Sequence, residues 1–213
     1  AEPGIRDSVA SRGLGDVYKR QLKRSLIMNS KTTGWILTIF PILGMACWAL
    51  SPLLALGPPG EYEGGYGAMA AELGKSANAV SLWMALAGLA YAILTVGLIS
   101  LKSKYTDGNY GYMAGILLLV GFAGQGVETG SFSAAAQAAS KGAEMIPSAA
   151  ALLVLAATAG GGATAIFALG LALLGAGLYM KKSVHVISSA SYMICLLYTS
   201  DAADEGLGVD LGG

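Results

Sequence analysis

The chain has 213 residues, of which 54% are hydrophobic and only 12% are charged, and its mean hydropathy is +0.60. A soluble domain carries about 25% charged residues, so this composition argues against a soluble protein. The formal net charge is zero, which provides no basic surface for nucleic acid, and nucleic acid is not an expected partner. The 31 glycines suit helices that pack closely in lipid.

Both ends of the chain contain peptides that one short DNA element can encode. IRDS lies at Ile5–Ser8, DVYKRQ at Asp16–Gln21 and CLLYTS at Cys195–Ser200. DVYKRQ back-translates to GATGTGTATAAGAGACAG; IRDS is another frame of that DNA, and CLLYTS is its reverse complement read one base later. These peptides resemble translated transposase-type adapters of sequencing libraries. The resemblance implies that residues 1–21 and 195–213 are foreign, disordered tails on a fragment of shotgun or metagenomic origin.

The remaining residues, 22–194, are expected to form one membrane domain, with Met28 as the candidate native start. The first predicted span is Gly34–Leu56, and its length of about 23 residues exceeds the apolar region of a signal peptide. Pro41 is expected to bend this helix, because proline removes a backbone donor. Thr38 is placed to compensate for backbone groups freed by the proline.

The second predicted span is Val80–Leu101, an uncharged stretch of about 22 residues. At the helical rise it extends about 33 Å, enough to cross a hydrocarbon core of about 30 Å. Trp83 near one end, and Lys102 and Lys104 beyond the other, match the flanks of a membrane helix. The short connection that follows predicts an antiparallel hairpin with the third span.

The third predicted span runs from Gly111 to Glu128. Gly111 and Gly115 have the GxxxG spacing of closely packed membrane helices, a weak signal in a chain this rich in glycine. The Ala- and Ser-rich residues 129–145 that follow are expected to form a helix at or above the outer surface.

Ile146–Met180 is apolar for about 35 residues, too long for one ordinary span and too short for two with a turn. Because Gly160–Gly162 interrupts the stretch, we expect a break there. A fourth span then covers Ala163–Met180, preceded by a shorter apolar helix over Ala149–Ala159. That helix is either a re-entrant half-helix or an extension outside the membrane. Ser183–Ile194 is the candidate start of a fifth span, cut off at the C-terminal boundary.

These elements predict an all-α fold, an integral membrane bundle of about four transmembrane helices that is truncated at its C-terminus. Basic residues flank the start of the first span and the ends of the second and fourth, whereas the other connections hold most of the acids. Basic loops tend to stay in the cytoplasm. We therefore expect a multi-pass protein of the cytoplasmic membrane with its N-terminus in the cytoplasm.

Polar residues inside the spans are the candidate functional residues. Gln125 and Glu128 lie one turn apart, and an acid at membrane depth often marks an ion or proton path; alternatively, Glu128 lies in water at the interface. Tyr91 and Thr95 share one face and either form structural hydrogen bonds between helices or contact a substrate. The break expected at Gly160–Gly162 is the third candidate, since broken helices bind ions in transporters; the alternative is a packing kink.

Other chemistry has little support in the sequence. It lacks nucleophile, phosphate-loop, zinc and dinucleotide motifs. Cys47, Cys195 and His185 stand alone without ligand spacing, so neither a metal site nor a cofactor is expected.

Two functions from different classes remain. The first is a non-enzymatic subunit or scaffold of a membrane assembly, favoured by small-residue packing faces; its partners are the lipid bilayer and either other membrane subunits or a second copy. The second is a fragment of a secondary transporter or channel that uses Glu128, Gln125 and the helix break. An enzyme ranks third, because catalysis in a membrane needs clustered ionisable or metal-binding residues.

Overall fold

The structure, a computed structural model, describes residues 28–57, 61–106 and 108–182. The described residues contain helices and no strand, which confirms the all-α fold class. The elements are α2 (Ser30–Leu50), α3 (Pro52–Leu56), α4 (Gly65–Lys75), α5 (Ala77–Tyr105), α6 (Asn109–Ala139), the 3-10 turn η1 (Ala143–Met145) and α7 (Ile146–Met180). The adapter-like ends and the candidate fifth span lie outside the described residues.

Four of the described helices, α2, α5, α6 and α7, are long and apolar enough to cross a membrane. At the helical rise, the 21 residues of α2 match a hydrocarbon core of about 30 Å. The 31 residues of α6 and the 35 residues of α7 extend well beyond such a core. These lengths and compositions support a multi-pass membrane protein.

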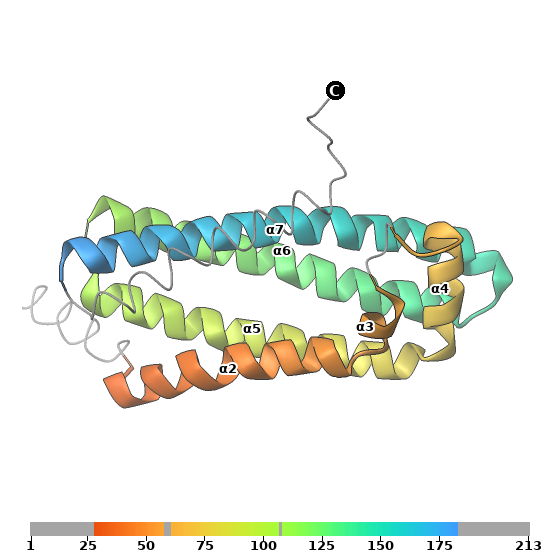
Figure 1. Ribbon diagram of the computed structural model, residues 1–213, viewed down its shortest axis with the longest axis horizontal. Coiled ribbons are helices and arrows are strands. Elements are labelled where there is room, and N and C mark those ends of the chain that lie inside the picture. The colour runs from red at the N-terminus through yellow and green to blue at the C-terminus, as the bar shows by residue number, and fades with distance from the viewer. Residues whose placement is uncertain (1–27, 58–60, 107, 183–213) are drawn as a thin grey trace, which may run out of the picture.

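The four long helices lie side by side in chain order. α2 packs on α5, α5 on α6, and α6 on α7, which form the most extensive pair. Figure 1 shows their axes nearly parallel, with α4 lying across one end of the bundle beside α6 and α7. Within the described chain, α7 has at most marginal contact with α2 or α5. The four helices therefore form an open row and not a closed ring.

Many large apolar side chains lie on the outside of the bundle, and small residues lie at many of the contacts between its helices. Ile42, Met45 and Leu54 are 66%, 71% and 66% exposed, and many other aliphatic side chains of the long helices are also exposed. Alanine and glycine occupy much of the interior, as at Gly121 and Ala163. Water would penalise this arrangement, whereas lipid tails solvate it and allow close backbone packing.

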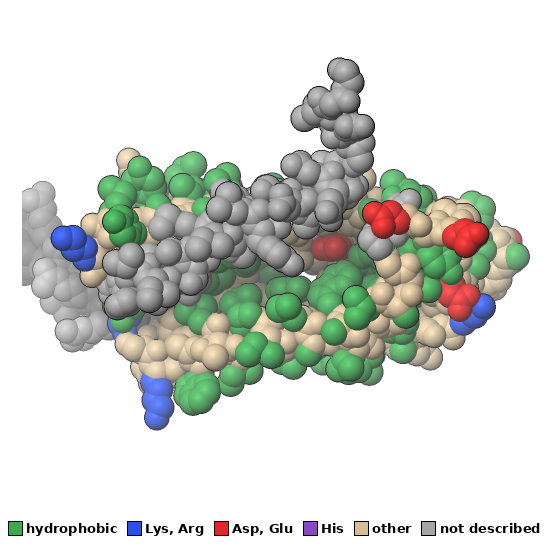
Figure 2. All heavy atoms as spheres, in the orientation of Figure 1, with side chains coloured by type: hydrophobic (Ala, Val, Ile, Leu, Met, Phe, Trp, Pro, Cys, Tyr) green, Lys and Arg blue, Asp and Glu red, His purple; other side chains and the backbone are tan. Residues whose placement is uncertain are grey.

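Charged side chains separate to the two ends of the bundle. Figure 2 shows lysine side chains at one end, and acidic side chains mainly at the end where α4 lies, with a lysine among them. The basic end carries Lys31, Lys102, Lys104, Lys181 and Lys182, and the acidic end carries Glu61, Glu63, Glu72 and Glu144 together with Lys75 and Lys141. At the acidic end, a 2.5 Å hydrogen bond to Glu72 and its charge raise the pKa of Lys75.

Two apolar clusters fill the bundle. The cluster at the acidic end joins α3, α4, α5, α6 and α7 through side chains such as Met69, Leu73, Phe132 and Leu153. Trp48 of α2 adds a T-shaped contact with Phe132, at 5.7 Å between ring centroids. The cluster at the basic end is smaller and joins α5, α6 and α7: Leu98, Leu101, Ala114, Leu118, Leu174 and Leu178.

The break predicted at Gly160–Gly162 is wrong, because α7 continues without interruption from Ile146 to Met180. α7 is therefore not divided into a separate helix over Ala149–Ala159 and a second helix starting at Ala163. Each glycine weakens a helix by about 1 kcal/mol relative to alanine. Leaving backbone groups unpaired in lipid costs several kcal/mol each, so the helix persists through the glycines.

The boundaries of two other predicted spans also differ from the structure. α6 continues past the predicted span end at Glu128 to Ala139, so the helix expected over 129–145 is largely an extension of α6, and it buries Phe132 and Ala136 in the cluster at the acidic end. The first span is split: α2 ends at Leu50, and Ser51 has an extended backbone before Pro52 starts α3. A residue before proline avoids the helical region, which accounts for this division.

The role predicted for Thr38 is wrong, whereas the bend expected at Pro41 stays a prediction. α2 runs through Pro41 as one helix. The hydroxyl of Thr38 donates to the Gly34 carbonyl at 2.9 Å, so it does not serve the carbonyl of Leu37, the group that Pro41 leaves without its usual donor. The predicted hairpin of the second and third spans is confirmed by the adjacent helices α5 and α6.

Candidate functional site

Glu128 lies on the side of α6 that packs against α7, and its side chain is half-buried. An added Cβ on Gly160 of α7 would fall within 3.0 Å of all three terminal atoms of the Glu128 carboxyl group. The missing side chain at Gly160 therefore provides the space that the carboxyl group occupies. Gly161 and Gly162 have nothing within 4 Å of the corresponding position, so only the first of the three glycines serves this purpose.

Glu128 lies between the two polar ends of α6. Toward the basic end, the Cβ position of Gly115 is 3.6 Å from Nζ of Lys102, and Glu128 follows Gly115 by 13 residues, about 20 Å of helix. Toward the acidic end, Gln137 lies nine residues further, about 14 Å away along the helix. Both separations place the carboxyl group within the part of α6 that a hydrocarbon core of about 30 Å would cover.

Gln125 connects Glu128 with α7. Its side-chain Nε2 donates to the Thr164 hydroxyl of α7 at 3.0 Å. Glu128 follows Gln125 by three residues, which places the two side chains on neighbouring turns of one side of α6. The two predicted partners on α6 are therefore adjacent in the structure. Thr164 was not predicted; its spacing of four residues from Gly160, on the same side of a helix, is the signal that could have identified it.

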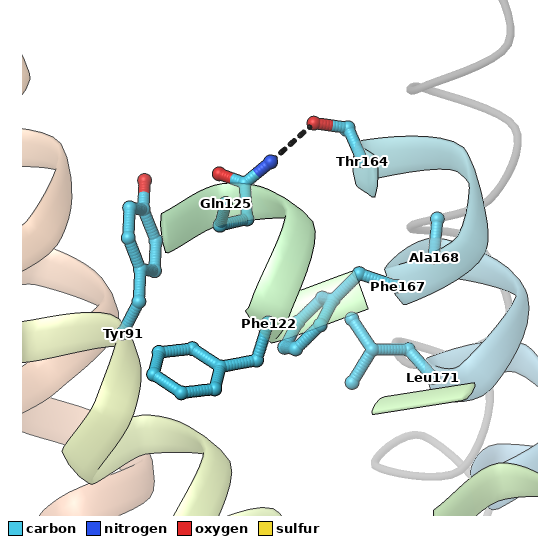
Figure 3. A pocket seen from close by; sticks show the side chains of 7 residues that line it. All are labelled: Tyr91, Phe122, Gln125, Thr164, Phe167, Ala168 and Leu171. Atoms are coloured by element: carbon cyan, nitrogen blue, oxygen red, sulfur yellow. Dashed lines mark hydrogen bonds between the residues drawn. The ribbon is translucent and has the colours of Figure 1, made fainter. Parts of the chain in front are cut away.

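A cavity of about 210 Å³ lies beside Gln125, lined by residues of three helices. The seven lining residues are Tyr91 of α5, Phe122 and Gln125 of α6, and Thr164, Phe167, Ala168 and Leu171 of α7. Figure 3 shows the polar ends of Tyr91, Gln125 and Thr164 toward one side of this pocket. The rings of Phe122 and Phe167 and the side chain of Leu171 lie toward the other side.

The second predicted pair divides between two positions. Tyr91 lines the pocket, and its ring packs against Gly44 of α2, whose Cβ position is 3.3 Å from Cε1 of Tyr91. Thr95 is buried one turn away, where its hydroxyl donates to the Tyr91 carbonyl at 2.8 Å. Tyr91 therefore belongs to the site, whereas Thr95 supports the backbone of α5.

The chemistry available at this site is that of one carboxyl group among neutral donors. Within the described ranges, no group of three His, Cys, Asp or Glu side chains could hold a metal ion. Cys47 is buried and forms no disulfide there, while Cys195 and His185 lie outside the described residues. A carboxyl group near the amide of Gln125 and the hydroxyl of Thr164 can bind and release a proton.

Comparisons of the chain with protein-family models, curated proteins and solved structures find no match to any of them.

Proposed function

We propose that the chain is a multi-pass membrane protein that moves protons, with the carboxyl group of Glu128 as the group that takes up and releases the proton. The observation that carries this proposal is the position of Glu128, between the polar ends of α6 and in a space that Gly160 leaves open. An ionisable group in the hydrocarbon region destabilises a membrane protein and is usually retained for function. Gln125, one helical turn away on α6, supplies a neutral hydrogen-bonding group near it.

The direction of the bundle in the membrane follows from its charged ends. Lys102, Lys104, Lys181 and Lys182 lie at the end where α5 and α7 finish. Because basic segments are retained on the cytoplasmic side, we place this end in the cytoplasm and the end with α4 outside. The N-terminus of α2 then faces the cytoplasm, and the membrane is the cell membrane.

Proton uptake into liposomes tests the role of Glu128. The protein is reconstituted with a pH-sensitive dye inside the liposomes, and a potassium gradient with valinomycin drives protons inward. We expect the wild type to acidify the lumen and Glu128→Gln, which cannot ionise, to lose this activity. Glu144→Gln at the exposed acidic end is the matched control and should retain it.

Three results would contradict the proposal: wild-type uptake no faster than that of empty liposomes, undiminished uptake by Glu128→Gln, or equal loss in Glu144→Gln. Replacing all external sodium with choline separates proton movement from sodium-coupled movement. Uptake that stops without sodium would contradict a proton-only path.

A non-enzymatic subunit of a membrane assembly is the second candidate. The observation that favours it is the open row of helices, in which α7 has at most marginal contact with α2 within the described chain. A partner helix or a second copy could complete such a row. The same liposome experiment separates the two candidates, because an assembly role predicts unchanged behaviour on Glu128→Gln.

A further inference from the structure

Polar side chains follow the contact between α5 and α6 from the acidic end toward Glu128. Those on α6 are spaced four residues apart, which places them one above another on neighbouring turns. We name this line the polar seam, after its six residues: Asn78 and Ser81 of α5, and Gln125, Thr129, Ser133 and Gln137 of α6. Four successive polar positions are unusual for a packing face of a helix in lipid, where Gly and Ala suffice.

The seam starts at a polar cavity. This cavity, of about 230 Å³, lies where α4 meets α5 and next to the end of α6. Lys75, Ser76, Asn78 and Ser140 are among its lining residues. Asn78 belongs both to the cavity and to the seam, so the two are continuous.

The first part of the seam is a connected hydrogen-bond network. Gln137 donates to the side-chain oxygens of Asn78 at 3.3 Å and Ser81 at 3.0 Å. The hydroxyl of Ser133, one turn deeper, donates to Ser81 at 2.9 Å. Hydroxyl groups can both donate and accept, so Ser81 and Ser133 can also exchange partners with water.

At the next turn of α6, that of Thr129, a space lies between α5 and α6 where the turns before it have a hydrogen bond between the helices. The Thr129 hydroxyl donates to the Gln125 carbonyl of its own helix at 3.0 Å. Opposite it, α5 has Gly88, and an added Cβ there would lie 3.5 Å from Oγ1 of Thr129, an ordinary contact distance. Space for a methyl group therefore lies beside the hydroxyl.

The last residue of the seam belongs to the site. Gln125 lines the pocket and lies one helical turn from Glu128 on the same side of α6. Beyond it, Phe122 and Phe167 face the pocket on the side toward the basic end. The polar route thus leads from the acidic end to the carboxyl group and ends at aromatic rings.

We propose that the polar seam is a hydrated route through which a proton reaches Glu128 from the acidic end of the bundle. This inference rests on the proposed function of Glu128 and adds the direction of access. A purely structural seam would hold α5 and α6 together without admitting water.

Cysteine accessibility distinguishes a hydrated seam from a dry one. The variants are built on a protein with Cys47→Ala and Cys195→Ala and are placed in lipid nanodiscs, where a charged methanethiosulfonate reagent reaches both faces. Thr129→Cys on the seam is compared with Val127→Cys, which is two residues deeper on an exposed face of α6. The reagent reacts with the thiolate, and apolar surroundings raise the pKa of a thiol above its value in water. One pKa unit changes the thiolate fraction about tenfold, so we expect Thr129→Cys to react at least about tenfold faster than Val127→Cys.

Equal rates at these two positions would overturn the hydrated route, whatever the liposome experiment shows. Should Thr129→Cys elute as aggregate, Ser81→Cys against the exposed neighbour Leu82→Cys makes the same comparison on α5. The labelling does not depend on proton movement. Equal labelling rates can therefore occur while Glu128→Gln still loses proton uptake, and unequal labelling rates can occur while Glu128→Gln keeps it.

Filling the gap beside Thr129 tests the same route from α5. Gly88→Ala adds one methyl group at an ordinary contact distance, so the helices need not move. We expect it to slow labelling of Thr129→Cys by about tenfold, the effect of one pKa unit in the thiol, and to leave Ser133→Cys unchanged. Gly130→Ala, with nothing within 4 Å, is the control and should change neither. Unchanged labelling of Thr129→Cys in Gly88→Ala contradicts the route.

Discussion

Gly160 shows how one missing side chain can position a functional group on another helix. The glycine triplet attracts attention in the sequence as a possible helix break, yet the helix continues through it. What the first glycine contributes is space for the terminal atoms of Glu128. A pattern in one segment cannot show this, because the occupant comes from a residue more than thirty positions earlier in the chain.

Substituting Gly160 tests that interpretation at the level of a single methyl group. In Gly160→Ala the added Cβ would displace the carboxyl group of Glu128, and a side chain forced from its rotamer costs about 0.5–1.5 kcal/mol. We expect slower proton uptake and a modest loss of thermal stability in detergent. Gly161→Ala, which meets open space, should keep full uptake and gain up to about 1 kcal/mol. Identical behaviour of both variants would show that Gly160 provides no space for Glu128.

At the scale of elements, the sequence identifies the four long helices but not their full lengths. Apolar length and basic flanks suffice to find α5, whose predicted core lies inside Ala77–Tyr105. The extension of α6 past Glu128 depends on Phe132 and Ala136 packing against other helices, which no local pattern reports. Gln125 and Glu128 could be proposed because they are polar in an apolar stretch, whereas Thr164 and Phe167 look like ordinary helix residues.

Close packing of α6 on α7 makes a second prediction, about helix separation. A Cβ on Gly121 would lie 2.7 Å from Cβ and 2.8 Å from Cα of Phe167. The backbone of α7 cannot rotate away as a side chain can, so Gly121→Ala must force the helices apart, at a cost of about 1–3 kcal/mol. Thermal unfolding in detergent measures this loss. Gly126→Ala on the same helix meets nothing within 4 Å and should be neutral or stabilising; equal melting temperatures would refute the close contact.

The whole molecule is organised by the separation of charge between its ends. The alternation of basic and acidic connections along the sequence predicts this arrangement, and the structure places the basic ends of α5 and α7 together. The open row could not be foreseen, because hydropathy shows which segments cross a membrane but not which faces of the helices meet.

The orientation of the bundle makes a prediction for fusions at opposite ends. A reporter enzyme that is active only outside the cytoplasm should be active when joined after Gly64, in the connection before α4. The same enzyme joined after Gly108, between α5 and α6, should be inactive because that turn adjoins Lys102 and Lys104. Activity at Gly108 without activity at Gly64 would reverse the proposed orientation.

The packing of α4 across one end gives the molecule two kinds of interior. Met69, Leu73 and Leu153 form a core of large apolar side chains there, where α6 and α7 are long enough to extend past the lipid. Its stability would come from removing apolar surface from water and would carry the heat-capacity change of such burial. Farther along α6 and α7, packing at the glycines replaces contacts with lipid by contacts with protein. This replacement does not carry the heat-capacity change of burial from water. Heat and chemical denaturants should therefore loosen the acidic end, where α4 lies, before they separate the lipid-embedded parts of α6 and α7.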